Sequence, residues 1–526
     1  MRLKNTCQQV IQRLENIQLT FYSGFATLLS IIFVRNFLEI FSDSNKYWNL
    51  LNFEKFFLHY PVWSIALLFL IIFALHVLSS EKIEKITKIT VLFSVIIWSV
   101  PILDLILSQG RGFNISYLHG DFNSLVKQFI TYFGPYSGKG ASYGMRIEIG
   151  TVLFLTFLYI FYKKGSILKA IITPFIIYSI IFILGSFPAW IKIILQLSYN
   201  SDAASRFLEI EKILNHFYSF DIKISMFLLI IVLIFLFIWL YLYDKNVFKG
   251  ILKNVRFARV LHYEAMLITG IVLGYFTFNN SNIFTSPLSY LVLLCAVLSV
   301  FCAWLCAIGI NDFADVRIDA ISNRERPLVN QKIKKSDYKN IILIFFLLAL
   351  LYSYLVRYSF MIMIFVYIIL AYIYSAKPLR LRQIPVLSSF IIASASLIII
   401  MGGFLILTQN NSLSQFPGKV ILLVLLVYTL AVNFKDIKDI EGDKKCGIVT
   451  IPTLMGEKNG KRVVGILVFI SYILVPLILD IPGLIIFTVI YGLTSFWVLN
   501  AKKMKEFLFF TIYFIFLIQL FYFYNY

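Results

Sequence analysis

Charge is scarce in this sequence. Charged residues make up 14% of the 526 residues and hydrophobic residues 60%, and the mean hydropathy is +0.84. A soluble protein of this length needs a more polar surface, so the composition excludes one. Apolar runs long enough to cross a bilayer recur along the chain, without the alternation of barrel strands. The sequence therefore predicts an all-α, polytopic membrane protein.

Cysteine pairs and nucleotide motifs are also missing. None of the five cysteines stands in a CxxC motif, which argues against a zinc site or a disulfide framework. Cys302 and Cys306 lie one turn apart in an apolar segment and are expected to pack in the core. No GxxxxGK[ST] sequence is present, which disfavours a P-loop hydrolase. The polar first sixteen residues do not resemble a removable signal peptide.

Positive charge, by contrast, is in excess, with a formal net charge of +20. In a membrane protein, Lys and Arg gather in cytoplasmic loops, where they fix the topology. They also lie beside anionic headgroups or anionic substrates. We therefore expect contacts with membrane lipids and none with nucleic acid.

The apolar runs divide the chain into two membrane domains. We predict an N-terminal transmembrane domain of unknown role at residues 1–243, a basic interfacial linker at 244–260 and a second transmembrane domain at 261–526. The first domain has about six spans, near residues 17–41, 60–79, 89–108, 149–162, 170–190 and 224–243. The second has about nine, near residues 261–278, 287–310, 341–356, 360–375, 384–407, 419–432, 463–479, 482–499 and 507–524.

The loops between the nine spans differ sharply in charge. The even-numbered loops, 311–340, 376–383, 433–462 and 500–506, carry twenty Lys or Arg residues. The odd-numbered loops carry only Arg357 and Lys419. This asymmetry predicts a protein of the cell membrane whose even loops face the cytoplasm. One missed or additional helix would scramble the counts, so they support nine spans.

Two of the predicted cytoplasmic loops carry the same acidic pattern, DxxDxxxD. It consists of Asp312, Asp315 and Asp319 in "NDFADVRID", and of Asp436, Asp439 and Asp443 in "KDIKDIEGD". On a helix these positions share one face, where like charges repel by about 0.2–0.5 kcal/mol per pair. Acids at a helix end can simply be solvated, and flanking lysines can offset some repulsion. The repetition of the pattern favours a bound cation.

Magnesium is the cation that fits these acids best. It is held by one or two carboxylates together with substrate phosphates, so two facing acidic loops suggest Mg²⁺ bridging to a diphosphate. Basic side chains in the same loops could bind the phosphates, although each could also be a charge that only sets topology. The candidates are Arg324, Arg326, Lys377, Arg380 and Arg382, and Lys435 flanks the second motif. Asn311 lies near the face of the first.

Three segments resemble the signature segments of the UbiA-type intramembrane prenyltransferase superfamily. They are "NDFADVRIDAISNRERPL", "YSAKPLRLRQIP" and "KDIKDIEGDKKCGIVTIPTLMG", in the expected order, and the resemblance covers about residues 250–526. It implies a nine-helix bundle around a central cavity. It also implies Mg²⁺-dependent transfer of a polyprenyl group from a prenyl diphosphate to a lipophilic acceptor.

The resemblance also implies roles for individual residues. Asn311, Asp312, Asp315 and Asp319 match the first motif of the family, and Asp436, Asp439 and Asp443 match the second. We therefore expect all six aspartates to hold Mg²⁺, and Asp312, Asp315, Asp436 and Asp439 to be catalytic. From their place in the same loops, we expect diphosphate contacts from Asn311, Arg324, Lys377, Arg380, Arg382 and Lys435. The form of the second motif is more similar to that of members acting on glycerol-phosphate lipids, homogentisate or chlorophyllide than to that of hydroxybenzoate enzymes.

The sequence departs from the family at the start of the first helix of the bundle. Family members often have an Arg-Pro pair there, with an Asn two residues on, whereas this chain has "RVLH", with Arg259, Val260 and His262. His262 could hydrogen-bond an acceptor, or it could be an interfacial histidine with satisfied ring nitrogens. Residues 1–250 resemble no family, and family members usually lack such a half.

Two other functions are compatible with the sequence. An ion-coupled transporter could use the acidic clusters to bind Na⁺ or H⁺, although transporter acids usually lie near the middle of the membrane. Alternatively, the chain could fuse two functions, with the N-terminal domain delivering a lipid, recruiting a partner or serving only as an anchor.

Overall fold

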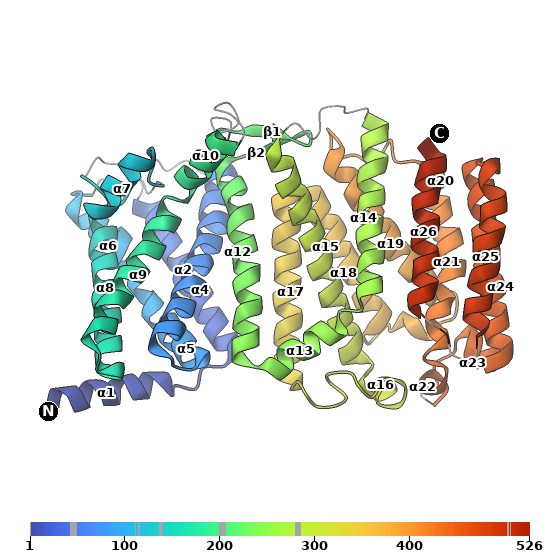
Figure 1. Cartoon of the computed structure of the whole chain (residues 1–526), viewed down its shortest axis with the longest axis horizontal. Coiled ribbons are helices and arrows are strands. Elements are labelled where there is room, and N and C mark those ends of the chain that lie inside the picture. The colour runs from blue at the N-terminus through green and yellow to red at the C-terminus, as the bar shows by residue number, and fades with distance from the viewer. Residues whose placement is uncertain are drawn as a thin grey trace. The chain divides into compact units, whose positions relative to one another are not determined.

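The computed structural model describes residues 2–42, 50–110, 112–113, 116–135, 140–198, 207–278, 286–445, 447–501, 504 and 506–525. Within these ranges, fifteen helices are long and apolar enough to cross a membrane (Figure 1). The regular structure outside helices, in the same ranges, is one hairpin of two three-residue strands. The prediction of an all-α, polytopic membrane protein is confirmed. Cys446 lies outside the described residues.

The chain forms two compact units. Unit 1 comprises residues 1–213 and 217–248, and unit 2 comprises residues 214–216 and 249–526. The helices and strands up to the boundary are α1 (Arg2–Glu15), α2 (Phe21–Ser42), α3 (Leu50–Glu54), η1 (Lys55–His59), α4 (Tyr60–Ser79), α5 (Ile83–Phe93), η2 (Ser94–Trp98), α6 (Ser99–Leu107), α7 (Phe122–Ile130), α8 (Tyr143–Lys164), α9 (Ile167–Gly185), α10 (Phe187–Ser198), β1 (Glu211–Ile213), β2 (His216–Tyr218), α12 (Phe220–Tyr243) and α13 (Lys245–Asn254).

Buried polar networks hold unit 1 together. At one end, Glu15 of α1 accepts hydrogen bonds from Lys163 at 2.6 Å and Tyr159 at 3.2 Å, both on α8. Elsewhere in the unit, the ring of His59 lies between the hydroxyls of Tyr117 and Ser225, each 2.9 Å from a ring nitrogen. Polar groups inside a membrane domain are stable when they are paired in this way.

Unit 2 contains the remaining elements. These are α14 (Phe257–Phe278), α15 (Pro287–Ala314), α16 (Val316–Ser322), α17 (Lys335–Val356), α18 (Tyr358–Ser375), η3 (Leu381–Gln383), α19 (Leu387–Leu407), α20 (Gly418–Leu422), η4 (Leu423–Tyr428), α21 (Thr429–Ala431), η5 (Val432–Ile437), α22 (Ile440–Lys445), α23 (Ile451–Met455), α24 (Glu457–Leu479), η6 (Pro482–Leu484), α25 (Ile485–Asn500) and α26 (Glu506–Asn525). Nine of the candidate spans belong to this unit as described.

Two glycines allow α14 and α19 to touch backbone to backbone. A Cβ atom on Gly270 of α14 would lie 1.9 Å from the carbonyl oxygen of Ile400, and one on Gly403 of α19 would lie 2.3 Å from that of Leu267. Small residues at such contacts are how membrane helices pack closely, because lipid gives little hydrophobic drive for association. This contact fixes the position of α14, which carries His262.

Helix α15 is longer than the sequence analysis predicted. It runs to Ala314 rather than residue 310, and the backbone hydrogen bonding continues past its end, with the amide of Asp315 donating to Asn311 at 2.9 Å and that of Asp319 to Asp315 at 2.9 Å. The first acidic motif is therefore an extension of a membrane helix rather than part of a free loop.

Arg357, one of the two basic residues of the odd loops, is a buried structural cation. Its guanidinium donates to the carbonyl oxygens of Leu405 at 2.7 Å and Thr408 at 2.5 Å, at the end of α19. The last carbonyls of a helix have no partner within the helix, so a guanidinium there stabilises its C-terminus. The other odd-loop cation, Lys419, is exposed and pairs with exposed Asp480.

These two residues give a matched test of stability. We expect Arg357→Met to lower the free energy of unfolding by about 1–3 kcal/mol, because it leaves buried carbonyl oxygens without donors. Lys419→Met should change it by less than about 0.5 kcal/mol, since exposed ion pairs contribute little. Thermal unfolding of the detergent-solubilised variants measures both. Equal melting temperatures would contradict the capping role of Arg357.

Candidate active site

The two acidic motifs lie side by side in unit 2. Asn323, at the end of α16, donates from its side-chain amide to Asp319 at 3.2 Å and to Asp439 at 3.1 Å. Arg382 makes a second connection, because its guanidinium contacts Asp315 and also Asp443, the latter at 3.1 Å. Motifs more than a hundred residues apart in sequence therefore share one site, as the repeated pattern predicted.

Asp312 is the most fully bonded acid of the site. Its side chain is 2% exposed. It accepts hydrogen bonds from Arg256 at 2.6 Å, from the Tyr338 hydroxyl at 3.0 Å, and from Asn254 and Arg326. With two guanidinium partners, its charge is compensated within the protein.

The other acids of the first motif have fewer donors. Asp315 accepts from Asn311 at 2.8 Å and from Arg380 at 3.0 Å, in addition to Arg382. Asp319 pairs with Arg326 at 2.9 Å. Burial raises the pKa of Asp319 to about 7. The ionised form therefore carries an electrostatic cost that a nearby cation would remove.

The second motif is less compensated by cations than the first. Asp436 is buried in η5, where Lys435 approaches to 3.9 Å. Burial raises the pKa of Asp443 to about 7, and one of its carboxylate oxygens, Oδ2, is buried without a hydrogen-bond partner. An unpartnered buried carboxylate oxygen is costly, and it indicates room for a further positive ligand.

The basic residues named by the sequence analysis fall into two groups. Arg380 and Arg382 contact Asp315, and Lys435 donates to the hydroxyl of Tyr374 at 3.0 Å. Arg324 is exposed on the rim of the site, and it is Arg326 that contacts the acids. Lys377 is exposed, and it is not among the described residues that line the cavity.

A cavity of about 710 Å³ opens in front of the acids. Four of the six motif carboxylates line it, those of Asp315, Asp319, Asp436 and Asp439. Asp312 and Asp443 are not in its lining, and they hold arginines instead. The opposite wall is aromatic and includes Tyr263, Trp304, Tyr367 and Tyr374.

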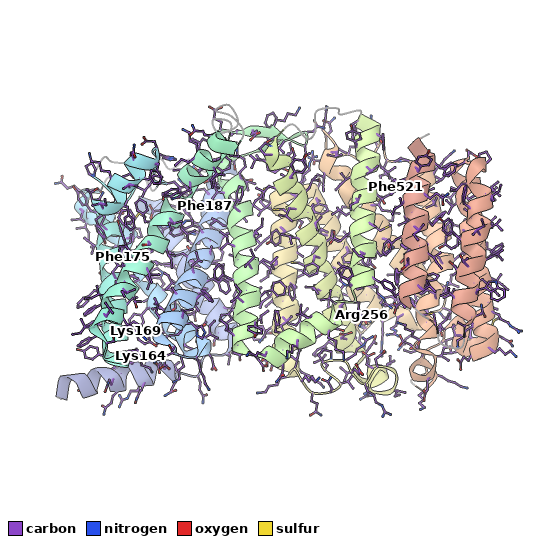
Figure 2. All side chains as sticks on the ribbon, viewed as in Figure 1. Lys164, Lys169, Phe175, Phe187, Arg256 and Phe521 are labelled. Carbon is purple, nitrogen blue, oxygen red and sulfur yellow. The ribbon has the colours of Figure 1, made fainter. Side chains whose placement is uncertain are left out.

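A second, apolar cavity of about 170 Å³ continues from the first. It lies among α14, η4, α24 and α26, and four side chains, His262, Tyr428, Phe434 and Phe510, line both cavities. Figure 2 shows Arg256, which lines the first cavity, and Phe521, which lines the second, toward opposite ends of the helices of unit 2. The two cavities therefore join a charged pocket at one end of the unit to an apolar channel within it.

The acidic side chains of the charged pocket offer carboxylate oxygens, the ligands that suit a cation such as Mg²⁺. Within the described residues, no three His, Cys, Asp or Glu side chains are arranged to hold a metal ion, and arginine or asparagine groups contact most of the acids. The cavity-facing carboxylates nevertheless fit a divalent cation that would be bound together with phosphate oxygens.

Comparison with known proteins identifies the fold of unit 2. The sequence model of the UbiA prenyltransferase family matches residues 267–523. The digeranylgeranylglyceryl phosphate synthase of Sulfolobus acidocaldarius is 31% identical over 215 residues, which cover 39% of this chain and 70% of that protein. The chain belongs to the UbiA prenyltransferase family. The predicted resemblance and the prediction of a transferase are confirmed.

Two further proteins are similar to part of the chain. The digeranylgeranylglyceryl phosphate synthase of Methanobrevibacter smithii is 30% identical over 194 residues, covering 35% of this chain and 66% of that protein, slightly less than two thirds of its length. A UbiA homolog from Archaeoglobus fulgidus, solved bound to GPP and Mg²⁺, is 18% identical with a TM-score of 0.41, covering 52% of this chain and 98% of that one.

Several residues of this UbiA-family site were missed by sequence reasoning. Asn254 and Arg256, which hold Asp312, lie in the stretch that was interpreted as a basic interfacial linker. Asn323, which bridges the motifs, and Tyr338, which donates to Asp312, lie in the loop and helix that follow the first motif. The sequence offered one signal for these residues, the polar pair Asn254 and Arg256 directly before the first helix of the bundle.

Proposed function

We propose that this protein transfers a prenyl group from a prenyl diphosphate to a lipophilic acceptor at the membrane, with the diphosphate bound between the two acidic motifs. The observation that carries the proposal is the joining of the motifs by Asn323 and Arg382 around a cavity that continues into an apolar channel. A molecule with a doubly charged head and an isoprenoid tail matches both parts. The charge asymmetry of the loops favours a site on the cytoplasmic side.

The residues have distinct roles in this proposal. Asp315, Asp319, Asp436 and Asp439 would hold Mg²⁺, which neutralises the diphosphate and stabilises it as a leaving group. Arg382, which lines the cavity, and Arg380, which contacts Asp315, would bind diphosphate oxygens, since guanidinium groups pair with phosphates in a bidentate manner. Asp312 keeps Arg256 and Arg326 in position behind the acids. The apolar channel excludes water from the allylic carbon while its bond to oxygen breaks.

The relatives say least about the acceptor, because the segments aligned with this chain cover only about two thirds of each relative. Glycerol-phosphate lipids that already carry one prenyl chain are the first candidates, since the relatives are named for a glyceryl phosphate with two such chains. Homogentisate is the second, from the form of the second motif.

Ion-coupled transport is a weaker alternative. Transporter acids lie near the membrane midplane on broken helices. Asp312 and Asp315, by contrast, lie at the C-terminal end of α15, and both are held by arginines. Membership of the prenyltransferase family also favours transfer. Ion-dependent uptake by vesicles that contain the protein, without any prenyl diphosphate, would favour transport.

Donor binding gives a test that does not require the acceptor. We expect geranyl diphosphate with Mg²⁺ to stabilise the detergent-solubilised protein by about 2.7 kcal/mol at one hundred times its dissociation constant. Geranyl monophosphate should stabilise it far less because it lacks the second phosphate. Geranyl diphosphate with EDTA should do the same because Mg²⁺ is removed. Thermal unfolding measures the shift, and an assay for released diphosphate follows turnover with candidate acceptors. Equal shifts with and without Mg²⁺ would contradict the proposal.

A further inference from the structure

The junction of the two cavities is where bond formation must occur. This inference rests on the proposed function, in which the diphosphate lies among the acids and the prenyl chain lies in the apolar channel. The allylic carbon between them then lies beside the four side chains that line both cavities. Three of these are the aromatic rings of Tyr428, Phe434 and Phe510. The fourth, His262, is the one that has a ring nitrogen able to accept a proton.

The hydrogen bonds of His262 define which ring nitrogen can accept a proton. Ser396 donates its hydroxyl to the carbonyl of Ile392 at 3.1 Å, so its oxygen accepts from Nε2–H of His262, also at 3.1 Å. Nδ1 is then the acceptor for the hydroxyl of Tyr513 at 3.0 Å. Tyr513 itself lines the apolar channel. Tyr513, His262 and Ser396 thus form an oriented chain that begins at the channel wall.

Prenyl transfer produces a proton that must be removed. The C–O bond of the donor breaks, and its electron pair leaves with the diphosphate. An electron pair of the acceptor's hydroxyl oxygen or ring carbon forms the new bond to the allylic carbon, and the acceptor must then release one proton. The nearby carboxylates are engaged with arginines and a metal ion in the proposed complex, so they are poorly suited to receive it.

We propose that His262 accepts this proton through Tyr513. The hydroxyl oxygen of Tyr513 takes the proton of the acceptor while the tyrosine passes its own proton to Nδ1 of His262. The resulting imidazolium keeps its Nε2–H bond to Ser396, and stacking on Tyr428, with ring centroids 4.9 Å apart, favours the cation. After product release the proton returns to solvent through the charged cavity.

Three elements present titratable side chains to His262. Tyr263 and Arg259 face it from its own helix, Tyr428 from η4 and Tyr513 from α26. Of these, Arg259 is the charged one, and it is paired with Glu506 at 3.3 Å. The hydrogen bonds of the His262 ring are those of a neutral imidazole, so the ring enters the reaction able to accept a proton.

The test compares two histidines in similar surroundings. His59 of unit 1 also lies between a tyrosine and a serine that donates to a backbone carbonyl, so His59→Asn is a matched control for loss of a buried imidazole. The donor in the assay is geranylgeranyl diphosphate. The acceptor is geranylgeranylglyceryl phosphate or homogentisate, according to which of the two the unmodified protein prenylates. The measured quantities are kcat and the KM for the donor.

We expect His262→Asn and His262→Gln to lower kcat by about 10²–10⁴-fold. The KM for the donor and the Mg²⁺-dependent thermal shift with geranyl diphosphate should stay within twofold of the unmodified protein, which also shows that the variants fold. Tyr513→Phe should also lower kcat and leave the KM for the donor unchanged.

Two results would overturn the inference. One is a kcat for both His262 variants within threefold of that of His59→Asn, and the other is a loss of kcat that is matched by an equal rise in the KM for the donor. Either leaves the Mg²⁺ dependence of donor binding intact. Failure of the proposed function would instead appear in the unmodified protein, as donor binding that does not depend on Mg²⁺.

Discussion

Asp436→Asn should lower prenyl transfer by at least about 100-fold and leave the stability of the protein almost unchanged. Asp436 faces the cavity and is compensated mainly by Lys435, at 3.9 Å. Asparagine keeps the shape of the side chain and removes its charge, so the loss falls on metal and diphosphate binding rather than on folding. Removing a buried, weakly paired carboxylate also removes its desolvation cost, which opposes any destabilisation.

Asp312→Asn should behave differently. Its carboxylate compensates Arg256 and Arg326, and both cations are largely buried. Breaking a buried pair leaves an unpaired charge and costs about 3–5 kcal/mol, so this variant should lose both activity and thermal stability. Turnover and thermal unfolding are measured for both variants. Together they distinguish an acid that binds the metal and diphosphate, Asp436, from one that holds arginines in place, Asp312. Equal stability losses in the two variants would contradict this division of the motif.

The sequence contained the positions of the acids but not their partners. The spacing of Asp312, Asp315 and Asp319 is a local property of one helix, and the same is true of the second motif, so both patterns could be found by periodicity. Arg256 reaches Asp312 across 56 residues, and Asn323 reaches Asp439 across 116. Such contacts depend on how whole helices pack, and no local pattern encodes that packing.

The sequence also did not show which of the basic residues contact the acids. Twenty Lys and Arg residues stand in the even loops, and topology alone explains their presence. Whether a given cation turns inward depends on its place on the element that carries it. Arg324 and Arg326 are two residues apart after α16, yet the first is exposed and the second contacts two acids. The fold class, by contrast, follows from composition and run length, which is why it was predicted correctly.

Arg382→Lys should lower kcat/KM for the prenyl diphosphate by about 10²–10³-fold, because one side chain joins the two motifs. The Arg382 guanidinium contacts Asp315 with one nitrogen and Asp443 with the other, at 3.1 Å for the latter. A lysine ammonium is a single point of charge and cannot hold two carboxylates in the same geometry. The variant keeps the positive charge of the site, so the loss would come from a change in the distance between the two motifs.

Arg324→Lys is the matched control for Arg382→Lys, because Arg324 lies on the rim of the same cavity and is exposed. It should change kcat/KM by less than threefold, since an exposed lysine replaces an exposed arginine with little effect on either motif.

Donor titrations at several Mg²⁺ concentrations would show the cause of the loss in Arg382→Lys. If the motifs move apart, the Mg²⁺ concentration needed for half-maximal rate should rise together with the KM for the donor. If Arg382 acted only as a phosphate contact, the donor KM would rise alone, and the bridging role assigned to it would be wrong.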